Sequence, residues 1–574
     1  SREDTEHTGR VLLQEHLSKR GLPAQKISGS PLLADVIREM GFRKADDFYI
    51  ALGGAKISPK VVVNKILQRL KQGEAAEGEE TTVEDLVVGR RERRQPTRSN
   101  NQYGIRVEGA PYPPIDPSLL SDGQPRPTYE VAFTGQPVEL REPSPAADVA
   151  RAGDPDPRGN PNPVIFHEYR PTDTLDKGLT NAADMSGVDS ERDVVMMSFN
   201  WSCDVSTDGG GSWTRLDPTA VFPQLGNGFC CDQIVTYVPE FDHFVWFLQY
   251  RPDAAGQGAF RIATASSQSV QNDPTAWTYW DFVAGDFGFA TSDMDYPDLA
   301  FSSQYLYAST DVLGTGGRLV LRILLQELAA EGTIGFEYTD PAQSTSAWGG
   351  HLVQQTRSQA VWVGHRDNST LEVFTMPDTG NTYSSFTVTV ATWPNGNHSS
   401  LGPDGNDWLT KLQNFPNFAV TGGVERRDGH VVVAWSASNG EGTAGGFTFP
   451  NTHARVVELD IGARSVVSEM QVWNPDYAFA YPALAVNGTD EVGIILGWGG
   501  PANHANCAMG IIGDFVVWFR DDSTRTVQRF GDYLTTRRAE RNRTLFAGFG
   551  YYVTEVVSQP DRCTYNPFYA RYGR

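Results

Sequence analysis

The spacing of apolar residues changes from helical to strand-like along the chain. In the first 73 residues, apolar positions three and four apart predict helices over residues 8–20, 30–41, 46–52 and 58–71. Glycines, or a serine followed by proline, punctuate these segments, so this part predicts a small α-helical domain. From about residue 180 onward, short aromatic and β-branched runs separated by polar turns predict a mainly β structure.

The β part contains a repeated unit. Each unit has a short strand, a polar turn and a stronger apolar strand, and the units recur at intervals of about 50 to 66 residues. We predict hairpins that begin near Asn181, Cys231, Tyr296, His351, Pro416, Tyr481 and Asp532. Four-stranded sheets repeated around an axis leave only short edges, so the pattern predicts a β-propeller. Seven blades are favoured, with six as the alternative if one hairpin is an insertion.

Two further features support a closed ring. A similar phrase recurs at residues 296–300, 415–419 and 481–485, which indicates the same point of the same unit. The last unit, residues 532–574, is short, and a strand over residues 162–170 is expected to complete it. The two ends of the propeller would then close the ring together.

Composition divides the chain into three parts. Seven of the nine lysines lie in the helical part, whereas all thirteen tryptophans lie at or beyond Trp201. Between them, thirteen of the 35 prolines fall within residues 111–163, which favours an extended spacer. We therefore predict a helical domain at residues 1–75, a charged and then Pro-rich linker at 76–161, and the propeller at 162–574.

The charge and hydropathy of the chain argue against some classes of binding partner. A net charge of -22 and an isoelectric point near 4.9 argue against binding to DNA. No run of about 18 apolar residues predicts a membrane span, and the amino terminus shows no signal-peptide pattern. No cofactor and no metal-ligand spacing are indicated.

The five cysteines leave several pairings open. They are Cys203, Cys230, Cys231, Cys507 and Cys563. We favour reduced or buried thiols. The alternatives are a vicinal disulfide between Cys230 and Cys231, a bridge from that pair to Cys203, and a pair formed by Cys507 and Cys563.

The clearest motif has the pattern of an Asp box, S-x-D-x-G-x-[ST]-W, formed by Ser206, Asp208, Gly210, Ser212 and Trp213. Serine and aspartate oxygens can satisfy backbone donors of a tight turn, so we predict a structural role. Through this motif the propeller resembles the sialidase-like superfamily. Exo-sialidases of that fold use three arginines, a tyrosine with a glutamate, and an acid/base aspartate, but their early Arg-Ile-Pro motif is not found here. We therefore assign no catalytic residues, and whether the chain is an enzyme stays undecided.

A second resemblance lies in the amino-terminal part. The runs GRVLLQEHLSKRGLPAQKI, PLLADVIREMGFRKADDFYIALGG and EDLVVGRRERR resemble the helical region after the TGS domain of long RelA/SpoT-type (p)ppGpp synthetase/hydrolases, over residues 1–109. The resemblance implies a cytoplasmic regulatory segment that contacts the ribosome and tRNA, without the catalytic domains of that family. A propeller of this kind instead favours an extracellular location. A natural fusion and a chimaera of two unrelated genes are both left open, as is the location.

Propeller topology places the candidate ligand residues. The loops that enter the innermost strands converge on one mouth of the central channel. The residues at these entries are Asp232, Asp295, Tyr296, His351, Tyr481, Asp532 and Tyr533. We predict that they bind a glycan or another ligand, a protein included; the alternative role is hydrogen bonding to the channel backbone and its water. A glycoside hydrolase of sialidase type is the alternative function, and ribosome-linked regulation through residues 1–109 is the second alternative.

Overall fold

The computed structural model consists of two compact units, Ser1–Thr81 and Thr82–Arg574. It describes residues 2–19, scattered positions between 33 and 66, four short stretches between 84 and 139, residues 165–169 and, with short gaps, residues 175–573. Among the described residues, no helix combines the length and the apolar character that crossing a membrane requires.

The amino-terminal unit is helical, as predicted. Helix α1 (Arg2–Lys19) packs on α4 (Ala45–Gly53), and their crossing depends on two glycines. A Cβ at Gly9 would lie 2.0 Å from the carbonyl oxygen of Tyr49, and one at Gly53 would lie 1.9 Å from that of Thr5. The two backbones therefore approach too closely for any side chain at these positions. The helices predicted at 30–41 and 58–71 lie largely outside the described residues.

The second unit is a seven-bladed propeller, which confirms the favoured blade number. Each blade is an antiparallel sheet, and its first strand lies innermost, in contact with the first strands of the two neighbouring blades. The first three blades are formed by β7 (Ser186–Asp189), β8 (Val195–Phe199), β9 (Ser202–Ser206) and β10 (Thr214–Leu216); β11 (Phe229–Val238), β12 (His243–Tyr250), β13 (Ala259–Ser266) and β14 (Thr278–Val283); and β15 (Met294–Phe301), β16 (Tyr305–Val312), β17 (Gly317–Leu324) and β18 (Ile334–Tyr338).

The next three blades repeat this order. They are formed by β19 (Trp348–Leu352), β20 (Gln359–His365), β21 (Thr370–Pro377) and β22 (Thr382–Thr389); β23 (Val420–Glu425), β24 (His430–Ala437), β27 (His453–Asp460) and β28 (Ser465–Trp473); and β29 (Ala478–Val486), β30 (Val492–Gly500), β31 (Asn503–Ile511) and β32 (Phe515–Trp518). Each predicted hairpin corresponds to the first two strands of one blade.

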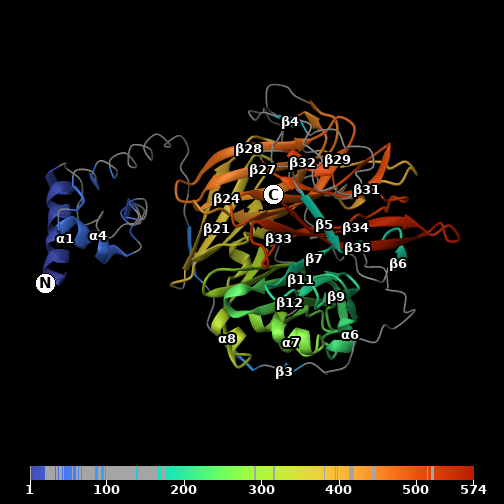
Figure 1. Ribbon diagram of the computed structural model, residues 1–574, viewed down its shortest axis with the longest axis horizontal. Coiled ribbons are helices and arrows are strands. Elements are labelled where there is room, and N and C mark those ends of the chain that lie inside the picture. Colours follow the sequence, from blue (N-terminus) through green and yellow to red (C-terminus); the bar gives the residue numbers. More distant parts are fainter. Residues whose placement is uncertain are drawn as a thin grey trace. The chain divides into compact units, whose positions relative to one another are not determined.

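The seventh blade joins the two ends of the propeller. It consists of β33 (Thr535–Arg538), β34 (Leu545–Glu555), β35 (Arg562–Gly573) and β5 (Ile165–Tyr169). The pairing of β5 with β35 places Ile165 opposite Gly573, and β6 (Leu175–Gly178) pairs with the other end of β35. Figure 1 shows the teal β5 beside the red β34 and β35. The strand predicted at 162–170 is therefore confirmed as the closing strand.

Part of the segment predicted as a linker, residues 76–161, adds strands to the outer edges of blades. The strands β1 (Glu84–Val87), β2 (Glu92–Arg94) and β3 (Thr97–Arg98) pair with β22, β18 and β14, and β4 (Pro137–Glu139) pairs with β28. Arg94 lies over the ring of Phe282 and forms a 2.7 Å ion pair with Asp286. An outer strand gains hydrogen bonds from a free sheet edge, a feature that composition does not reveal.

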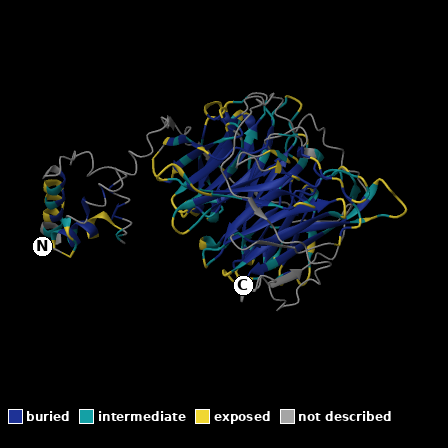
Figure 2. Ribbon diagram, turned by 90° about the horizontal axis from the view of Figure 1, so that it is seen from above, coloured by how far each residue is buried: buried dark blue, intermediate teal, exposed yellow. Residues whose placement is uncertain are grey.

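The core lies between neighbouring blades, where large aromatic side chains are fully buried. Figure 2 shows the buried strands of the blades surrounded by exposed loops. Among the residues whose burial the structure describes, eight tryptophans are at most 1% exposed: Trp246, Trp277, Trp280, Trp362, Trp393, Trp408, Trp435 and Trp498. Each large apolar side chain buried in this way stabilises the fold by about 1.5–3 kcal/mol.

Short elements connect the strands. The helical ones are α6 (Pro218–Val221), α7 (Ser267–Asn272), α8 (Leu325–Ala329), η2 (Pro239–Phe241), η3 (Ala284–Phe287), η4 (Pro341–Gln343) and η5 (Thr410–Leu412). A small hairpin is formed by β25 (Gly440–Glu441) and β26 (Thr448–Phe449).

The cysteine pairing corrects the favoured expectation. Cys230 and Cys231 form a vicinal disulfide, whereas Cys203, Cys507 and Cys563 are buried free thiols. Reduced thiols at 230 and 231 were therefore the wrong choice, and neither a bridge to Cys203 nor a pair of Cys507 with Cys563 is formed. Cys203, Cys507 and Cys563 lie on β9, β31 and β35, in three different blades.

Candidate functional site

Two tyrosines enter the axial mouth through unusual backbone conformations. Tyr296 and Tyr481 both have φ = 58°, a left-handed value that side-chain-bearing residues rarely adopt. Both occur where the inner strand shifts its register against the next strand, in β15 and in β29. A bulge of this kind redirects a side chain, and a proline follows each tyrosine. The copies of the repeated phrase at 296–300 and 481–485 therefore mark points at which inner strands bend into the mouth, whereas the copy at 415–419 lies largely outside the described residues.

Four aspartates surround the same point, each at or just before the start of an inner strand. They are Asp184, Asp232, Asp295 and Asp532, which are 1%, 5%, 3% and 2% exposed. Burial, followed by the negative charges of these four carboxylates, raises the pKa of Tyr296 and of Tyr533 well above the ordinary value. Side chains from blades one, two, three and seven thus share one electrostatic environment.

Asp184 and Asp532 form the most tightly coupled part of the mouth. The backbone N–H of Asp532 donates to Oδ1 of Asp184 at 2.5 Å, and Nδ2 of Asn200 donates to its Oδ2 at 2.6 Å. Burial and the nearby charge of Asp532 raise the pKa of Asp184 to about 6. Arg529 forms a 3.2 Å ion pair with Asp532.

Asp295 is held by its own strand and by a glutamine of the preceding blade, and Asp232 lies beside the disulfide. Asp295 accepts hydrogen bonds from Nε2 of Gln249 at 3.2 Å and from the backbone N–H of Tyr296 at 2.9 Å. Asp232 directly follows the vicinal disulfide, at the point where β11 shifts its register against β12. The disulfide therefore lies in the segment that positions Asp232.

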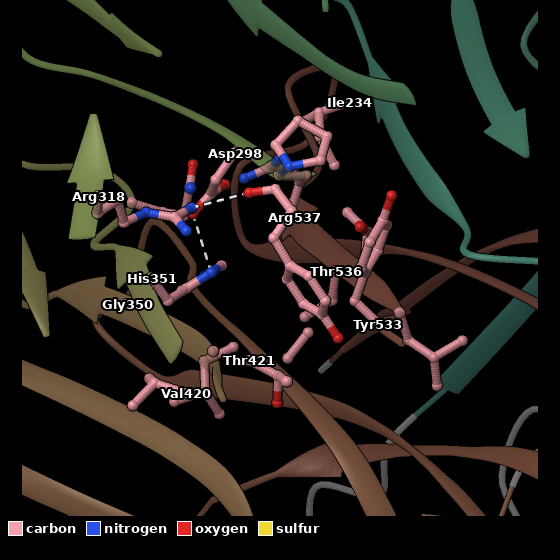
Figure 3. A pocket seen from close by; sticks show the side chains of 18 residues that line it. Ile234, Asp298, Arg318, Gly350, His351, Val420, Thr421, Tyr533, Thr536 and Arg537 are labelled. Atoms are coloured by element: carbon pink, nitrogen blue, oxygen red, sulfur yellow. Dashed lines mark hydrogen bonds and ion pairs between the residues drawn. The ribbon is translucent and has the colours of Figure 1, made fainter. Parts of the chain in front are cut away.

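A cavity of about 50 Å³ continues along the channel from the mouth. Tyr296 and Tyr533 line it, and Figure 3 shows Asp298, Arg318, His351 and Arg537 gathered on one side. Nδ1 of His351 lies 2.9 Å from Oδ2 of Asp298. Burial is the largest single influence on the pKa of Asp298 and raises it, but the charge and hydrogen bond of His351, the charge of Arg318 and the Leu352 N–H together lower it overall. A volume of this size has room for a few water molecules, at roughly 10–15 Å³ each.

The structure brings together six of the seven predicted ligand residues. Asp232, Asp295, Tyr296, Tyr481, Asp532 and Tyr533 share the mouth, as their mutual electrostatic effects show. His351 instead lies in the inner cavity, beside Asp298.

Sequence reasoning missed Asp184 and Arg529. Asp184 precedes β7, the inner strand of the first blade, so the rule that selected Asp232 and Asp532 should have selected it too. Arg529 lies in a loop before the closing blade, and no local pattern in the sequence marks it.

The Asp box forms the turn between β9 and β10. Asp208 accepts hydrogen bonds at Oδ1 from the backbone N–H of Ser212 and at Oδ2 from the Ser212 hydroxyl, at 2.8 and 2.7 Å. Ser206 accepts a hydrogen bond from the N–H of Gly210 at 2.8 Å, and the Trp213 indole N–H donates to the Gly210 carbonyl at 3.0 Å. Although burial opposes it, this bonding lowers the pKa of Asp208. Every polar group of the motif is occupied within the turn.

The arrangement expected of an exo-sialidase does not surround the cavity. Among the described residues that line it, there are two arginines, Arg318 and Arg537, and no glutamate. Arg529 serves Asp532 in the mouth. Tyrosines and aspartates are present, but the combination of three arginines facing a tyrosine and a glutamate is not.

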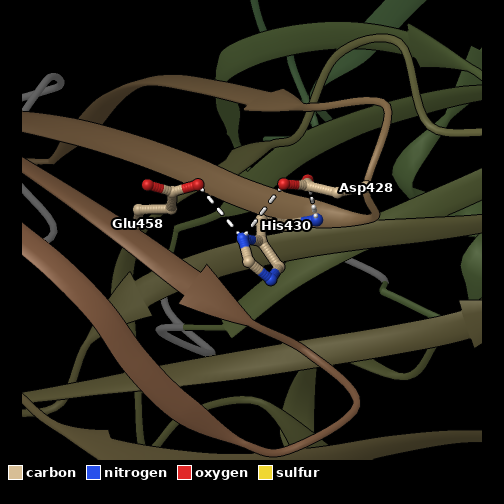
Figure 4. Close-up of side chains that lie close together, drawn as sticks. All are labelled: Asp428, His430 and Glu458. Atoms are coloured by element: carbon tan, nitrogen blue, oxygen red, sulfur yellow. Dashed lines mark hydrogen bonds and ion pairs between the residues drawn. The ribbon is translucent and has the colours of Figure 1, made fainter. Parts of the chain in front are cut away.

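A separate polar cluster lies at the hairpin between β23 and β24. One ligand atom each from Asp428, His430 and Glu458 lies within 4.8 Å of the others, a spacing at which the three could hold a metal ion (Figure 4). Nδ1 of His430 lies 3.1 Å from Oε1 of Glu458, and the same oxygen accepts a 2.9 Å bond from Arg426. The guanidinium already neutralises the carboxylate, so the cluster is explained as a surface ion-pair network.

Comparison with known proteins identifies the amino-terminal part. Residues 1–67 match the family model described as the RelA/SpoT AH domain. The bifunctional (p)ppGpp synthase/hydrolase RelA of Mycobacterium tuberculosis is 31% identical over 110 residues, which cover 19% of this chain and 14% of that protein. A probable GTP pyrophosphokinase of Mycobacterium leprae is 30% identical over 110 residues, which cover 19% of this chain and 14% of that protein. The chain thus spans about one seventh of these relatives, and its resemblance to RelA/SpoT-type proteins is confirmed for residues 1–67.

Solved structures resemble the propeller. A protein of unknown function from Dyadobacter fermentans covers 70% of this chain and 98% of its own, with 11% identity and a TM-score of 0.33. The match to an α-L-arabinanase of Penicillium chrysogenum covers 69% of this chain and 98% of that protein, with 8% identity and a TM-score of 0.32. The GH93 α-L-arabinofuranosidase of Fusarium graminearum covers 71% and 98%, with 8% identity and a TM-score of 0.33. These values specify neither ligand nor reaction, and the relationship to sialidases stays a prediction.

Proposed function

We propose that the propeller binds a glycan, or a ligand similarly rich in hydroxyl groups, at the axial mouth. The observation that carries the proposal is the convergence of four buried aspartates and three tyrosines from separate blades. Carboxylates are strong acceptors for sugar hydroxyls, and phenol rings present flat apolar faces with a polar edge. Burying several carboxylates is costly, and ring closure alone does not require it. A polar ligand that donates hydrogen bonds would offset this cost.

The test is binding to a glycan array, followed by titration of each hit. We expect Asp295→Asn and Asp532→Asn to weaken binding at least tenfold, because each removes a charged acceptor. Glu240→Gln is the matched control, since Glu240 is an exposed acid on η2. Wild-type affinity in both mouth variants would rule out the proposed site.

Hydrolysis of a glycoside is the second candidate, and one observation favours it. Burial and the charge of Asp532 raise the pKa of Asp184 to about 6. Two carboxyl groups whose pKa values differ are what acid and base catalysis of glycoside cleavage requires. Activity on aryl glycosides would then fall as pH rises above 6, and Asp184→Asn would abolish it. If the wild-type protein hydrolyses no member of a broad panel of glycosides, hydrolysis is ruled out and binding is the remaining function.

The RelA/SpoT AH match supports a separate proposal for residues 1–67. We infer that this part contacts the ribosome or tRNA if the fusion is natural. The full chain should then co-sediment with ribosomes, and a chain that begins at residue 82 should not. Intact-mass analysis of the native product tests the fusion itself, since two separate masses would show that the parts are not one polypeptide.

A further inference from the structure

Arg537, which is partly buried, differs from the fully buried arginines of the propeller. Arg261, Arg322 and Arg455 each form an ion pair with a carboxylate on the neighbouring strand, at 2.5 to 2.6 Å. Within the described part of the chain, the side chain of Arg537 has no such pair, and its buried Nε has no hydrogen-bond partner. Arg537 lies on β33 and lines the axial cavity (Figure 3). Among the described residues, the guanidinium that the closing blade contributes to the cavity thus has no carboxylate in an ion pair with it.

The carboxylate whose charge acts on Arg537, that of Asp298, already has other partners. Asp298 lies 2.9 Å from His351, and it accepts the backbone N–H groups of Leu299 and Leu352 at 2.8 Å each. Its charge still acts on Arg537, but burial is the larger effect and lowers the pKa of Arg537 to about 10. The charge of this guanidinium is therefore only partly compensated.

The neighbouring Arg318 shows what a satisfied arginine looks like in the same cavity. It donates to Asp311 at 2.7 Å, to the Ser309 hydroxyl at 3.1 Å and to the Tyr296 carbonyl at 3.1 Å. Arg318 is thus a structural cation that ties β16 and β17 to the mouth. Arg537 has no corresponding set of acceptors, so its donors remain available to a ligand.

We propose that Arg537 binds a small oxyanion, a carboxylate or a phosphate, within the axial cavity. A planar guanidinium matches two oxygens of such a group, which suits it better than a spherical halide. The cavity of about 50 Å³ limits the guest to a small free anion or to one acidic group of a larger ligand. His351, held by Asp298, lines the same cavity and adds a second polar group. This site is separate from the aspartates of the mouth and does not rest on glycan binding.

Thermal unfolding with different anions tests the proposal. Wild-type protein is titrated with sodium phosphate and with sodium acetate, and sodium chloride keeps the ionic strength constant. We expect a saturable rise in Tm of roughly 2–4 °C with one of the two oxyanions. Which salt acts distinguishes a phosphate site from a carboxylate site. Because no glycan is used, the result is independent of the proposed function.

Three variants make the test specific. Arg537→Gln should lose the response, Arg537→Lys should keep a weaker one, and Arg541→Gln should respond as wild type, because Arg541 is 55% exposed and pairs with Asp193. Without added oxyanion, Arg537→Gln should melt no lower than wild type, since it removes a poorly compensated charge. An equal response of Arg537→Gln would overturn the proposal. If that variant does not fold, calorimetric titration of wild type with phosphate and with acetate decides, because the absence of heat in both overturns it.

Discussion

At the scale of single residues, the mouth collects buried charges that the fold must compensate. The same is true of Asp189 at the end of β7, which is 2% exposed. It accepts hydrogen bonds from the Glu540 N–H at 2.9 Å and from the Tyr569 hydroxyl at 3.0 Å. Burial nevertheless raises its pKa to about 7. Asp189 therefore destabilises the fold when it is ionised.

This gives a pH dependence with a defined sign. The folded pKa is above the unfolded one, so the folded state holds its proton longer, and stability falls as pH rises from about 4 through 7. The shift corresponds to roughly 4 kcal/mol at most. We expect Asp189→Asn to be more stable than wild type at pH 8 and to differ less at pH 5, by urea unfolding. The same difference in unfolding free energy between Asp189→Asn and wild type at both pH values would contradict this. Glu240→Gln is the control.

At the scale of elements, tight turns and bulges place the chemistry. The Asp box satisfies its own donors at the turn between β9 and β10, whereas the bulges of β11, β15 and β29 direct side chains into the mouth. The motif was visible in the sequence because its residues are contiguous. The repeated phrase marked the bulges of β15 and β29 but not that of β11, because strand register depends on the partner strand.

Removal of the Asp-box carboxylate should affect stability and leave ligand binding unchanged. Asp208→Ala deletes the acceptor for the Ser212 N–H and hydroxyl, which should cost about 1–2 kcal/mol by urea unfolding. Asp217→Asn is a matched control that removes one charge from a nearby acid outside the motif. A loss of glycan affinity in Asp208→Ala without loss of stability would place the motif in the binding site instead.

The vicinal disulfide should influence the mouth through the bulge of β11. A double Cys230→Ser, Cys231→Ser variant frees the segment before Asp232, so we expect weaker glycan binding with a smaller change in Tm. Ligand titration with and without a reducing agent measures the effect. Cys203→Ser is the control, because Cys203 is a buried free thiol of another blade. Unchanged affinity in the double variant would show that Asp232 is positioned without the disulfide.

At the scale of the whole molecule, stability depends on closure by β5. This strand supplies the outer position of the seventh blade from a segment nearly 400 residues before β35. Without β5, the part of β35 that pairs with residues 165–169 would lose its interstrand hydrogen bonds. The two ends of the propeller would then no longer be joined by this strand pair.

Truncation tests this closure. A chain that begins at residue 162 lacks the outer strands β1 to β4 but keeps β5, and it should unfold cooperatively. A chain that begins at residue 175 should melt at least 5 °C lower or become prone to aggregation, because about five paired residues are lost. Scanning calorimetry compares the two. Identical melting would show that the remaining six blades and the incomplete seventh suffice.

The sequence by itself determined the fold class, the seven repeats, the closing strand and most of the axial mouth. These follow from local alternation of apolar and polar residues and from a repeat, which places equivalent positions around one axis. Only the tertiary structure decided that Asp184 and Arg529 join the mouth, that His351 leaves it for Asp298, that Cys230 pairs with Cys231 and that β1 to β3 edge the blades. Apart from the pairing of the adjacent Cys230 and Cys231, these features depend on contacts between residues distant in the chain, whose energies come from burial and partner geometry. Asp184 could have been found from its place before an inner strand, whereas no local pattern marks Arg529.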